Sequence, residues 1–124
     1  MLNGATSHAT VAVTDIDRAK EFYGKTLGLT AKDDVSGGVT YETGGTWFLV
    51  YPSQFAGTGK STAMSFEVQD LGATVKGLRE AGVTFEDYDF PGLKTVDGIA
   101  EIEGERTAWF KDPDGNILAV GERT

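Results

Sequence analysis

The chain repeats one sequence pattern, and this repeat constrains the fold more than any other feature. The first copy passes from an alternating apolar segment near residue 8 through Asp15 to Gly28. The second copy passes from near residue 63 through Asp70 to Gly82. Each copy reads as a strand, an acidic helix start, an amphipathic helix and a glycine stop. The nearly equal spacing from Asp to Gly therefore predicts two structural modules of the same kind.

This repeat predicts an α+β fold of two βαβββ modules, which form a half-barrel sheet with the helices on its outer face. A chain of 124 residues is long enough for a single domain with its own core. We place the first module at about residues 5–52, a linker at 53–61 and the second module at about 62–124. The strands are predicted at about 8–13, 29–33, 39–43, 46–51, 63–68, 83–88, 99–102, 106–111 and 117–120, and the helices at about 17–26 and 71–81. A long loop through Pro91 and Gly92 is expected after residue 88.

Composition excludes several classes of function. The net charge of −8 argues against binding to nucleic acid, because contact with a phosphate backbone requires a positive surface. The chain contains no cysteine, so disulfides, thiolate nucleophiles and sulfur-ligated metals are absent. We find no signal peptide and no apolar run near the roughly 20 residues of a membrane span. These features predict a cytoplasmic protein with no membrane partner.

Strand alternation separates the predicted sheet into two faces of different character. The uniformly apolar face, which is expected to pack against the helices, comprises Val11, Val13, Phe48, Val50, Met64, Phe66, Val68, Phe110, Leu118 and Val120. The opposite face mixes small, aromatic and polar residues and comprises His8, Thr10, Ala12, Trp47, Leu49, Tyr51, Ala63, Ser65, Glu67, Thr107, Trp109, Ile117 and Ala119. Such a mixture favours a cup for a small organic molecule, with a dimer interface as the alternative.

Two ionisable residues on this second face are candidates for chemistry. His8 is the only histidine, and it could bind a ligand, transfer a proton or lie at the surface near the terminus. Glu67 is expected in the middle of a strand, where enclosure would raise the pKa of its carboxyl and suit it to proton transfer. An edge position open to water is the alternative for Glu67.

Aromatic residues lie on or near the same face, among small neighbours, and indicate a pocket for a planar or hydrophobic ligand. The predicted binding residues are His8, Thr10, Trp47, Leu49, Tyr51, Ser65, Glu67, Tyr88 and Trp109, with Phe90 nearby. Between the last two predicted strands, the segment Asp112-Pro113-Asp114-Gly115-Asn116 indicates a tight hairpin turn. It lacks the glycine at the sixth position that a calcium-binding loop of the EF-hand type requires.

The combined pattern resembles the vicinal-oxygen-chelate superfamily, which includes glyoxalase I, extradiol dioxygenases and the fosfomycin- and bleomycin-resistance proteins. The segments that carry the resemblance are His8 with Asp15, residues 17–19, residues 22–23, residues 27–29 and residues 110–116. They span nearly the whole chain. The resemblance implies paired βαβββ modules and a homodimer with pockets near the subunit contact.

The resemblance also implies where metal-dependent members carry their ligands. The four equivalent positions in this chain hold His8, Leu49, Ala63 and Ala119. Leu and Ala side chains cannot coordinate a metal, and one imidazole is not enough to retain a divalent ion. We therefore expect no metal and no other cofactor.

These observations favour a metal-free protein that binds a small, aromatic or hydrophobic compound, as the sequestering resistance proteins of the superfamily do. One alternative is a lyase or isomerase of the glyoxalase type without a metal, in which Glu67 is the catalytic base and His8 polarises a carbonyl. Another alternative retains metal catalysis, with His8 joined by Glu67 and by Glu101 or Glu103.

Overall fold

The computed structural model describes residues 1–35 and 37–123, with side chains described to residue 122. The chain divides into two compact units, Met1–Ala56 and Gly57–Thr124, and the boundary falls within the predicted linker. Both units combine a mixed sheet with helix, so the predicted α+β class is correct. None of the described helices has the length and apolar character needed to span a membrane.

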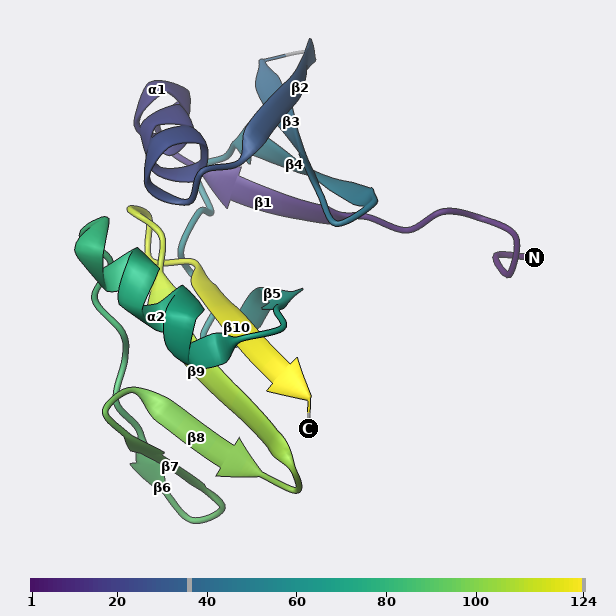
Figure 1. Cartoon of the computed structure of the whole chain (residues 1–124). Helices are drawn as coiled ribbons and strands as arrows, with labels where there is room; N and C mark the ends of the chain where they lie inside the picture. The colour runs from purple at the N-terminus through teal and green to yellow at the C-terminus, as the bar shows by residue number, and fades with distance from the viewer. Residues whose placement is uncertain (36, 124) are drawn as a thin grey trace. The chain divides into compact units, whose positions relative to one another are not determined.

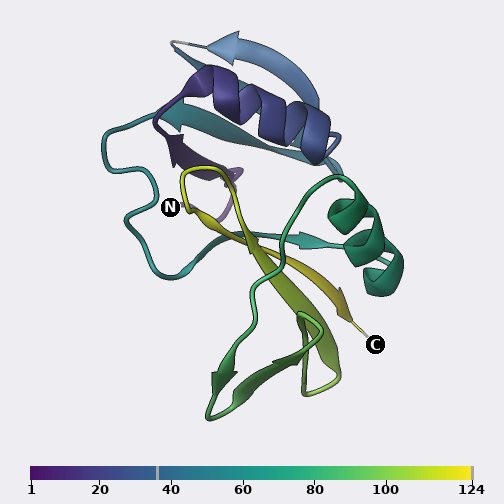
Figure 2. The ribbon, with the colours of Figure 1, turned by 90° about the vertical axis from the view of Figure 1, so that its left-hand side faces the viewer.

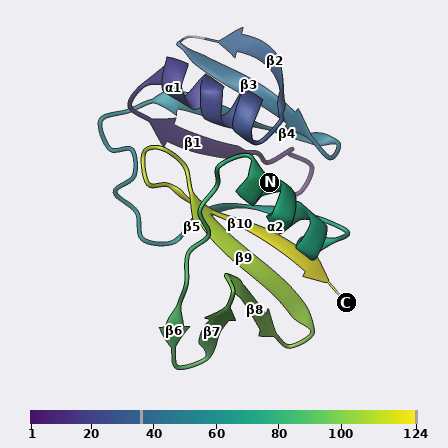
Figure 3. The same ribbon diagram turned by 60° about the vertical axis from the view of Figure 1, so that its left-hand side comes forward.

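Unit 1 is a βαβββ module (Figure 1). Its elements are β1 (Ala9–Val13), α1 (Ile16–Lys20), the π-helix η1 (Glu21–Thr26), β2 (Thr30–Val35), β3 (Gly38–Thr43) and β4 (Thr46–Pro52). The strand order is β1-β4-β3-β2, with β1 parallel to β4 and the other pairs antiparallel. Figure 3 shows α1 and η1 as one helical rod on a single face of this sheet.

The first helix begins where the sequence predicts a capping residue. The Asp15 carboxylate accepts hydrogen bonds from the backbone N–H groups of Asp17, at 3.0 Å, and Arg18, at 3.1 Å. These bonds satisfy two donors that the first turn of a helix leaves without partners. The buried Tyr23 of η1 then packs against Tyr41 and Phe48 of the sheet, with ring centroids 6.0 and 5.8 Å apart. This aromatic group forms the centre of the core of unit 1, together with buried aliphatic residues of the strands.

Unit 2 repeats the module and extends it. Its elements are β5 (Thr62–Glu67), α2 (Leu71–Glu80), β6 (Asp89–Phe90), β7 (Leu93–Val96), β8 (Ile99–Ile102), β9 (Glu105–Lys111) and β10 (Ile117–Arg123). The strand order is β5-β10-β9-β8-β7-β6, with β5 parallel to β10. The strands β5, β10, β9 and β8 therefore repeat the order β1-β4-β3-β2, which confirms the repeat inferred from sequence.

The predicted apolar face is also correct. Its members Val11, Val13, Phe48, Val50, Phe110, Leu118 and Val120 are each 3% exposed or less. Met64, Phe66 and Val68 are half-buried. In unit 2 this face packs against α2, whose buried residues are Leu71 and Val75.

Two predictions for residues 83–98 are wrong. The expected strand at 83–88 makes only a single bridge between Phe85 and Phe110. The expected loop through Pro91 and Gly92 is instead the β6–β7 hairpin, which extends the sheet at the end away from β5 (Figure 2). The sequence did contain one signal of strands in this region, the Asp97-Gly98 dipeptide, which is typical of a hairpin turn. Both residues have positive φ angles and form the turn between β7 and β8.

A buried hydroxyl fixes the start of this hairpin. Thr95 Oγ1 accepts the N–H of Tyr88 at 2.8 Å and donates to Asp87 Oδ1 at 3.1 Å. The same carboxylate oxygen of Asp87 accepts the N–H of Gly98 at 3.1 Å. This hairpin is thus held by the polar contacts of Thr95. The alternation of apolar residues, which was used to predict strands, does not reveal such contacts.

The turn between β9 and β10 is the predicted hairpin, and Asp112 holds it together. This side chain is 4% exposed. Its Oδ1 accepts the N–H groups of Asp114, at 3.0 Å, and Asn116, at 2.8 Å, while Oδ2 accepts the side-chain amide of Asn116 at 2.8 Å. The carboxylate therefore satisfies two backbone donors at the end of the two longest strands of unit 2.

We predict that Asp112→Ala lowers the free energy of unfolding by about 1–3 kcal/mol, because it leaves these donors without their acceptor. Urea denaturation followed by circular dichroism measures the change. Asp112→Asn retains the acceptor Oδ1 and should lower the free energy of unfolding by less than Asp112→Ala. A loss below about 0.5 kcal/mol in Asp112→Ala would show that the turn does not depend on this carboxylate.

Candidate functional site

The strand register of unit 2 places six residues on one face of β5, β10 and β9, which we call the open face. Ser65 lies opposite Ala119, and Ala119 lies opposite Trp109. In the next row, Glu67 lies opposite Gly121, and Gly121 lies opposite Thr107. The structure thus brings together Ser65, Glu67 and Trp109, which the sequence placed on a common face.

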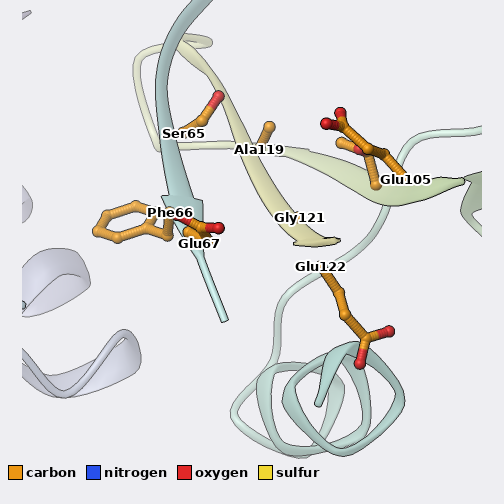
Figure 4. A pocket seen from close by; sticks show the side chains of 8 residues that line it. Ser65, Phe66, Glu67, Glu105, Ala119, Gly121 and Glu122 are labelled. Carbon is orange, nitrogen blue, oxygen red and sulfur yellow. The ribbon is translucent and has the colours of Figure 1, made fainter. Parts of the chain in front are cut away.

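An open depression of about 350 Å³ lies on this face (Figure 4). It is lined by Ser65, Phe66, Glu67, Glu105, Thr107, Ala119, Gly121 and Glu122. Its volume lies within the range of roughly 300–1,000 Å³ that is typical of small-molecule sites. Carboxylates and hydroxyls surround a floor of small residues, so the site can offer hydrogen bonds at its sides and apolar contact at its base.

Gly121 leaves the floor of the depression open. It lies in β10, between β5 and β9, so it is surrounded by paired strands. A Cβ atom at this position would be 3.6 Å from Thr107 Oγ1 and 3.7 Å from the Arg106 carbonyl oxygen, which are ordinary contacts. Backbone strain therefore does not require glycine here. A glycine inside a strand often marks a place where a ligand approaches closely.

Sequence reasoning did not predict Gly121, Glu105, Thr107 or Glu122 as site residues. Thr107 was placed on the correct face but was not selected. A usable signal for Gly121 was present, because it follows Ala119 at the strand period of two and belongs to the same face. The predicted strand at 117–120 ended one residue too early to include it, whereas β10 continues to Arg123.

An aromatic cluster lies on β9, on β6 and just before β6, and its Trp109 is opposite Ala119 of the depression. The Tyr88 ring meets Trp109 edge to face with centroids 5.5 Å apart, and it stacks on Phe90 at 5.7 Å. Burial raises the pKa of the Tyr88 phenol, Glu86 raises it further and Lys111 opposes the shift. The phenol therefore keeps its proton at neutral pH and acts there as a hydrogen-bonding group.

Glu67 does not occupy the mid-strand position expected from sequence. It is the last residue of β5, which is an edge strand, and its side chain is exposed. The chain leaves the sheet soon after this residue, because Asp70 caps α2 by accepting the N–H of Ala73 at 3.0 Å. Figure 4 shows the carboxylate pointing from β5 toward the position of Gly121.

The other two carboxylates at the depression have different surroundings. Glu122 forms an ion pair with Arg106 at 3.0 Å, with both side chains partly buried. Glu105 projects from the end of β9, and Figure 4 shows its carboxylate pointing away from that of Glu122. The three carboxylates therefore do not converge on one point.

The remaining predicted site residues lie in unit 1. His8 precedes β1 and stacks on Trp47, with ring centroids 3.8 Å apart and the planes inclined by 23°. Thr10 lies opposite Leu49, and Tyr51 lies one step along the same face of β4. The predicted residues therefore form two groups, one with His8 and Trp47 in unit 1 and one on the open face of unit 2.

If the resemblance gives the equivalent ligand positions correctly, three of the four carry side chains that cannot coordinate a metal. Leu49, Ala63 and Ala119 present only carbon atoms, and Ala119 belongs to the floor of the depression. Within each unit, no three His, Cys, Asp or Glu side chains among the described residues are placed to hold an ion. His8 alone supplies too few donors.

The profile of the Glyoxalase/Bleomycin resistance protein/Dioxygenase superfamily matches residues 5–120. This chain belongs to that superfamily. The match covers both modules and confirms the resemblance drawn from the repeat and the Asp112–Asn116 turn. No curated protein sequence gives a significant match.

Solved structures of this superfamily fold cover almost all of the chain. An integron cassette protein from V. cholerae has 24% identity and a TM-score of 0.68, covering 100% of this chain and 98% of its own. The fosfomycin resistance protein FosX from Listeria monocytogenes has 16% identity and a TM-score of 0.73, covering 100% of this chain and 96% of its own. Lactoylglutathione lyase from Agrobacterium tumefaciens has 19% identity and a TM-score of 0.69, covering 96% of this chain and 93% of its own. At these identities the likeness concerns the fold.

Proposed function

We propose that this member of the superfamily binds a small organic compound on the open face of unit 2 and holds it without a metal. The observation that carries the proposal is the floor of the depression, where Ala119 and Gly121 leave room between the polar groups of Ser65, Glu67 and Thr107. The resemblance implies that Ala119 stands where chelating members carry a metal ligand. We also propose that the chain acts as a homodimer, as the resemblance implies.

The aromatic cluster supplies a second support for ligand binding. Trp109 is only half-buried, and Phe90 is 57% exposed. Covering roughly 100 Å² of such apolar surface would contribute about 2–3 kcal/mol to binding. An aromatic or hydrophobic compound seated over the floor could stack against this cluster while its polar groups reach Ser65 or Thr107.

We predict that Trp109→Ala weakens binding of an aromatic ligand roughly tenfold or more, because the stacking surface is lost. A library of small aromatic compounds, screened by ligand-observed NMR and then titrated by calorimetry, supplies the measurement. Val96→Ala is the control, since Val96 is exposed on β7 and does not line the depression. Equal affinity in Trp109→Ala and wild-type protein would remove Trp109 from the site.

An enzyme of the lyase or isomerase type is the second candidate, because the Glu67 carboxylate points toward the floor where a substrate would lie. In this alternative, Glu67 removes a proton from the bound compound. Proton transfer by Glu67 needs a carboxylate, whereas binding needs only a hydrogen-bonding group of similar shape.

We predict that incubation of each ligand with wild-type protein yields stoichiometric capture and no product. Product analysis by mass spectrometry over many equivalents of ligand checks this. Turnover that falls at least about a hundredfold in Glu67→Gln, with affinity retained, would instead establish the enzyme.

We predict only trace amounts of divalent metal in protein purified without chelators, as measured by elemental analysis. One equivalent of Zn, Ni, Mn or Fe would contradict the proposal. It would favour metal-dependent catalysis by this chain. Loss of that metal in His8→Ala, but not in an Asp89→Ala control, would then identify His8 as a ligand.

A further inference from the structure

We infer that Asn3 is a site of spontaneous modification, at which its side-chain amide is hydrolysed to a carboxylate with release of ammonia. This inference does not depend on the proposed ligand site. The chain places an Asn or Asp directly before glycine at three sites, residues 3–4, 97–98 and 114–115. Such a pair can close a five-membered ring, because glycine has no side chain to obstruct attack by its backbone nitrogen on the preceding side chain. The structure separates the three sites by the state of the glycine N–H group.

A turn before β1 presents Asn3 and Gly4 to solvent. The N–H of Ala5 donates to the carbonyl oxygen of Leu2 at 3.0 Å, so Asn3 and Gly4 are the two central residues of a β-turn. This turn uses the N–H of its last residue, and the N–H of Gly4 has no acceptor within the described part of the chain. Residues 1–8 are exposed, and a Cβ atom at Gly4 would lie in open space. Figure 1 shows this segment running beyond the start of β1. The Gly4 nitrogen is therefore accessible for attack.

The other two glycines hold their N–H groups in hydrogen bonds. The N–H of Gly98 donates to Asp87 Oδ1 at 3.1 Å, and the N–H of Gly115 donates to the carbonyl oxygen of Asp112 at 3.0 Å. Each hydrogen bond must break before the nitrogen can lose its proton and attack. Reaction at these two sites therefore requires local opening of a hairpin, which lowers its rate.

The second asparagine of the chain is fixed in the β9–β10 turn. Asn116 donates its side-chain amide to Asp112 Oδ2 and its backbone N–H to Asp112 Oδ1, both at 2.8 Å. The next residue is Ile117, whose branched side chain obstructs attack and which pairs with Lys111 in the sheet. Asn3 is exposed by contrast, so we expect the reaction there and not at Asn116.

The reaction needs only water as co-reactant. The Gly4 nitrogen loses its proton to hydroxide and forms a bond to Cγ of Asn3. The bond from Cγ to the side-chain nitrogen breaks, and this nitrogen takes a proton from water and leaves as ammonia. Water then opens the resulting succinimide ring at either carbonyl carbon, which gives aspartate or isoaspartate at this position. The product adds one negative charge to a chain whose net charge is −8, and isoaspartate lengthens the main chain by one carbon.

The conversion can be followed in the full-length protein. The protein is incubated at mildly alkaline pH, and mass spectrometry of the intact chain and of its peptides follows both asparagines. We expect Asn3 to convert while Asn116 is retained. The rate should rise with pH, because the attacking nitrogen must lose its proton. Asn3→Gln should remove the reaction, since the longer side chain would have to close a larger ring.

Asp97→Asn supplies a matched control within the same molecule. It places the same pair of residue types in the β7–β8 turn, where Asn before Gly is favoured and the N–H of Gly98 keeps its acceptor Asp87. In the folded variant, Asn3 should convert at least about tenfold faster than the amide at position 97. In the variant unfolded by urea, the two rates should become similar. Addition of Asp87→Ala removes the acceptor and should raise the rate at position 97 at least about threefold.

Each outcome decides the inference. Faster conversion at position 3 in the folded variant, with similar rates after unfolding, would establish it. If Asn3 stays intact while Asn116 or the amide at position 97 converts, the modification site is wrong. Equal rates at positions 3 and 97 in the folded variant would show that the hydrogen bond of Gly98 does not protect, and the inference fails. It also fails if the difference between the two positions persists in urea, because local sequence would then be its cause.

Discussion

The parallel pairing of the first and last strands is the constraint on which each module depends. A parallel pair needs a crossover connection, and in both modules that crossover includes the helix. The helix must bury its apolar stripe, so it covers one face of the sheet, where the apolar residues of the central strands gather. Alternation then leaves the remaining side chains on the other face. The open face of unit 2 is therefore a consequence of how β5, α2 and β10 are connected.

The chemistry of the open face follows from side-chain size as much as from polarity. Ala119 and Gly121 occupy successive positions of β10 on that face, where larger side chains would project from the sheet. Their small size separates Glu67 on one strand from Thr107 on the other and creates the depression. The scaffold of the superfamily is retained, while Ala119 and Gly121 present only a methyl group and a hydrogen on this face. A change of this kind alters what a face can bind without altering the pairing of its strands.

Much of the fold could be predicted because it depends on patterns that the chain displays twice. The spacing from Asp15 to Gly28 and from Asp70 to Gly82 predicted both helices, and alternation predicted the buried face. The β6–β7 hairpin was missed because the polar Thr95 and Asp87 hold it in place, and such contacts leave no periodic signal. Alternation placed Glu67 on the correct face but did not decide between the middle of a strand and the exposed edge position that the structure shows. Gly121 was missed because the predicted strand ended at residue 120, whereas β10 continues to Arg123.

The hairpin formed by β6 and β7 has no counterpart in the first module, and it joins the sheet at its outermost edge. Its attachment uses the local contacts of Asp87, Thr95 and Gly98, which lie outside the buried apolar core. The length and side chains of this hairpin can therefore change in evolution with a small cost to folding. Because Tyr88 immediately precedes β6 and Phe90 belongs to it, diversification of the hairpin offers related chains a route to new ligand preferences on an unchanged framework.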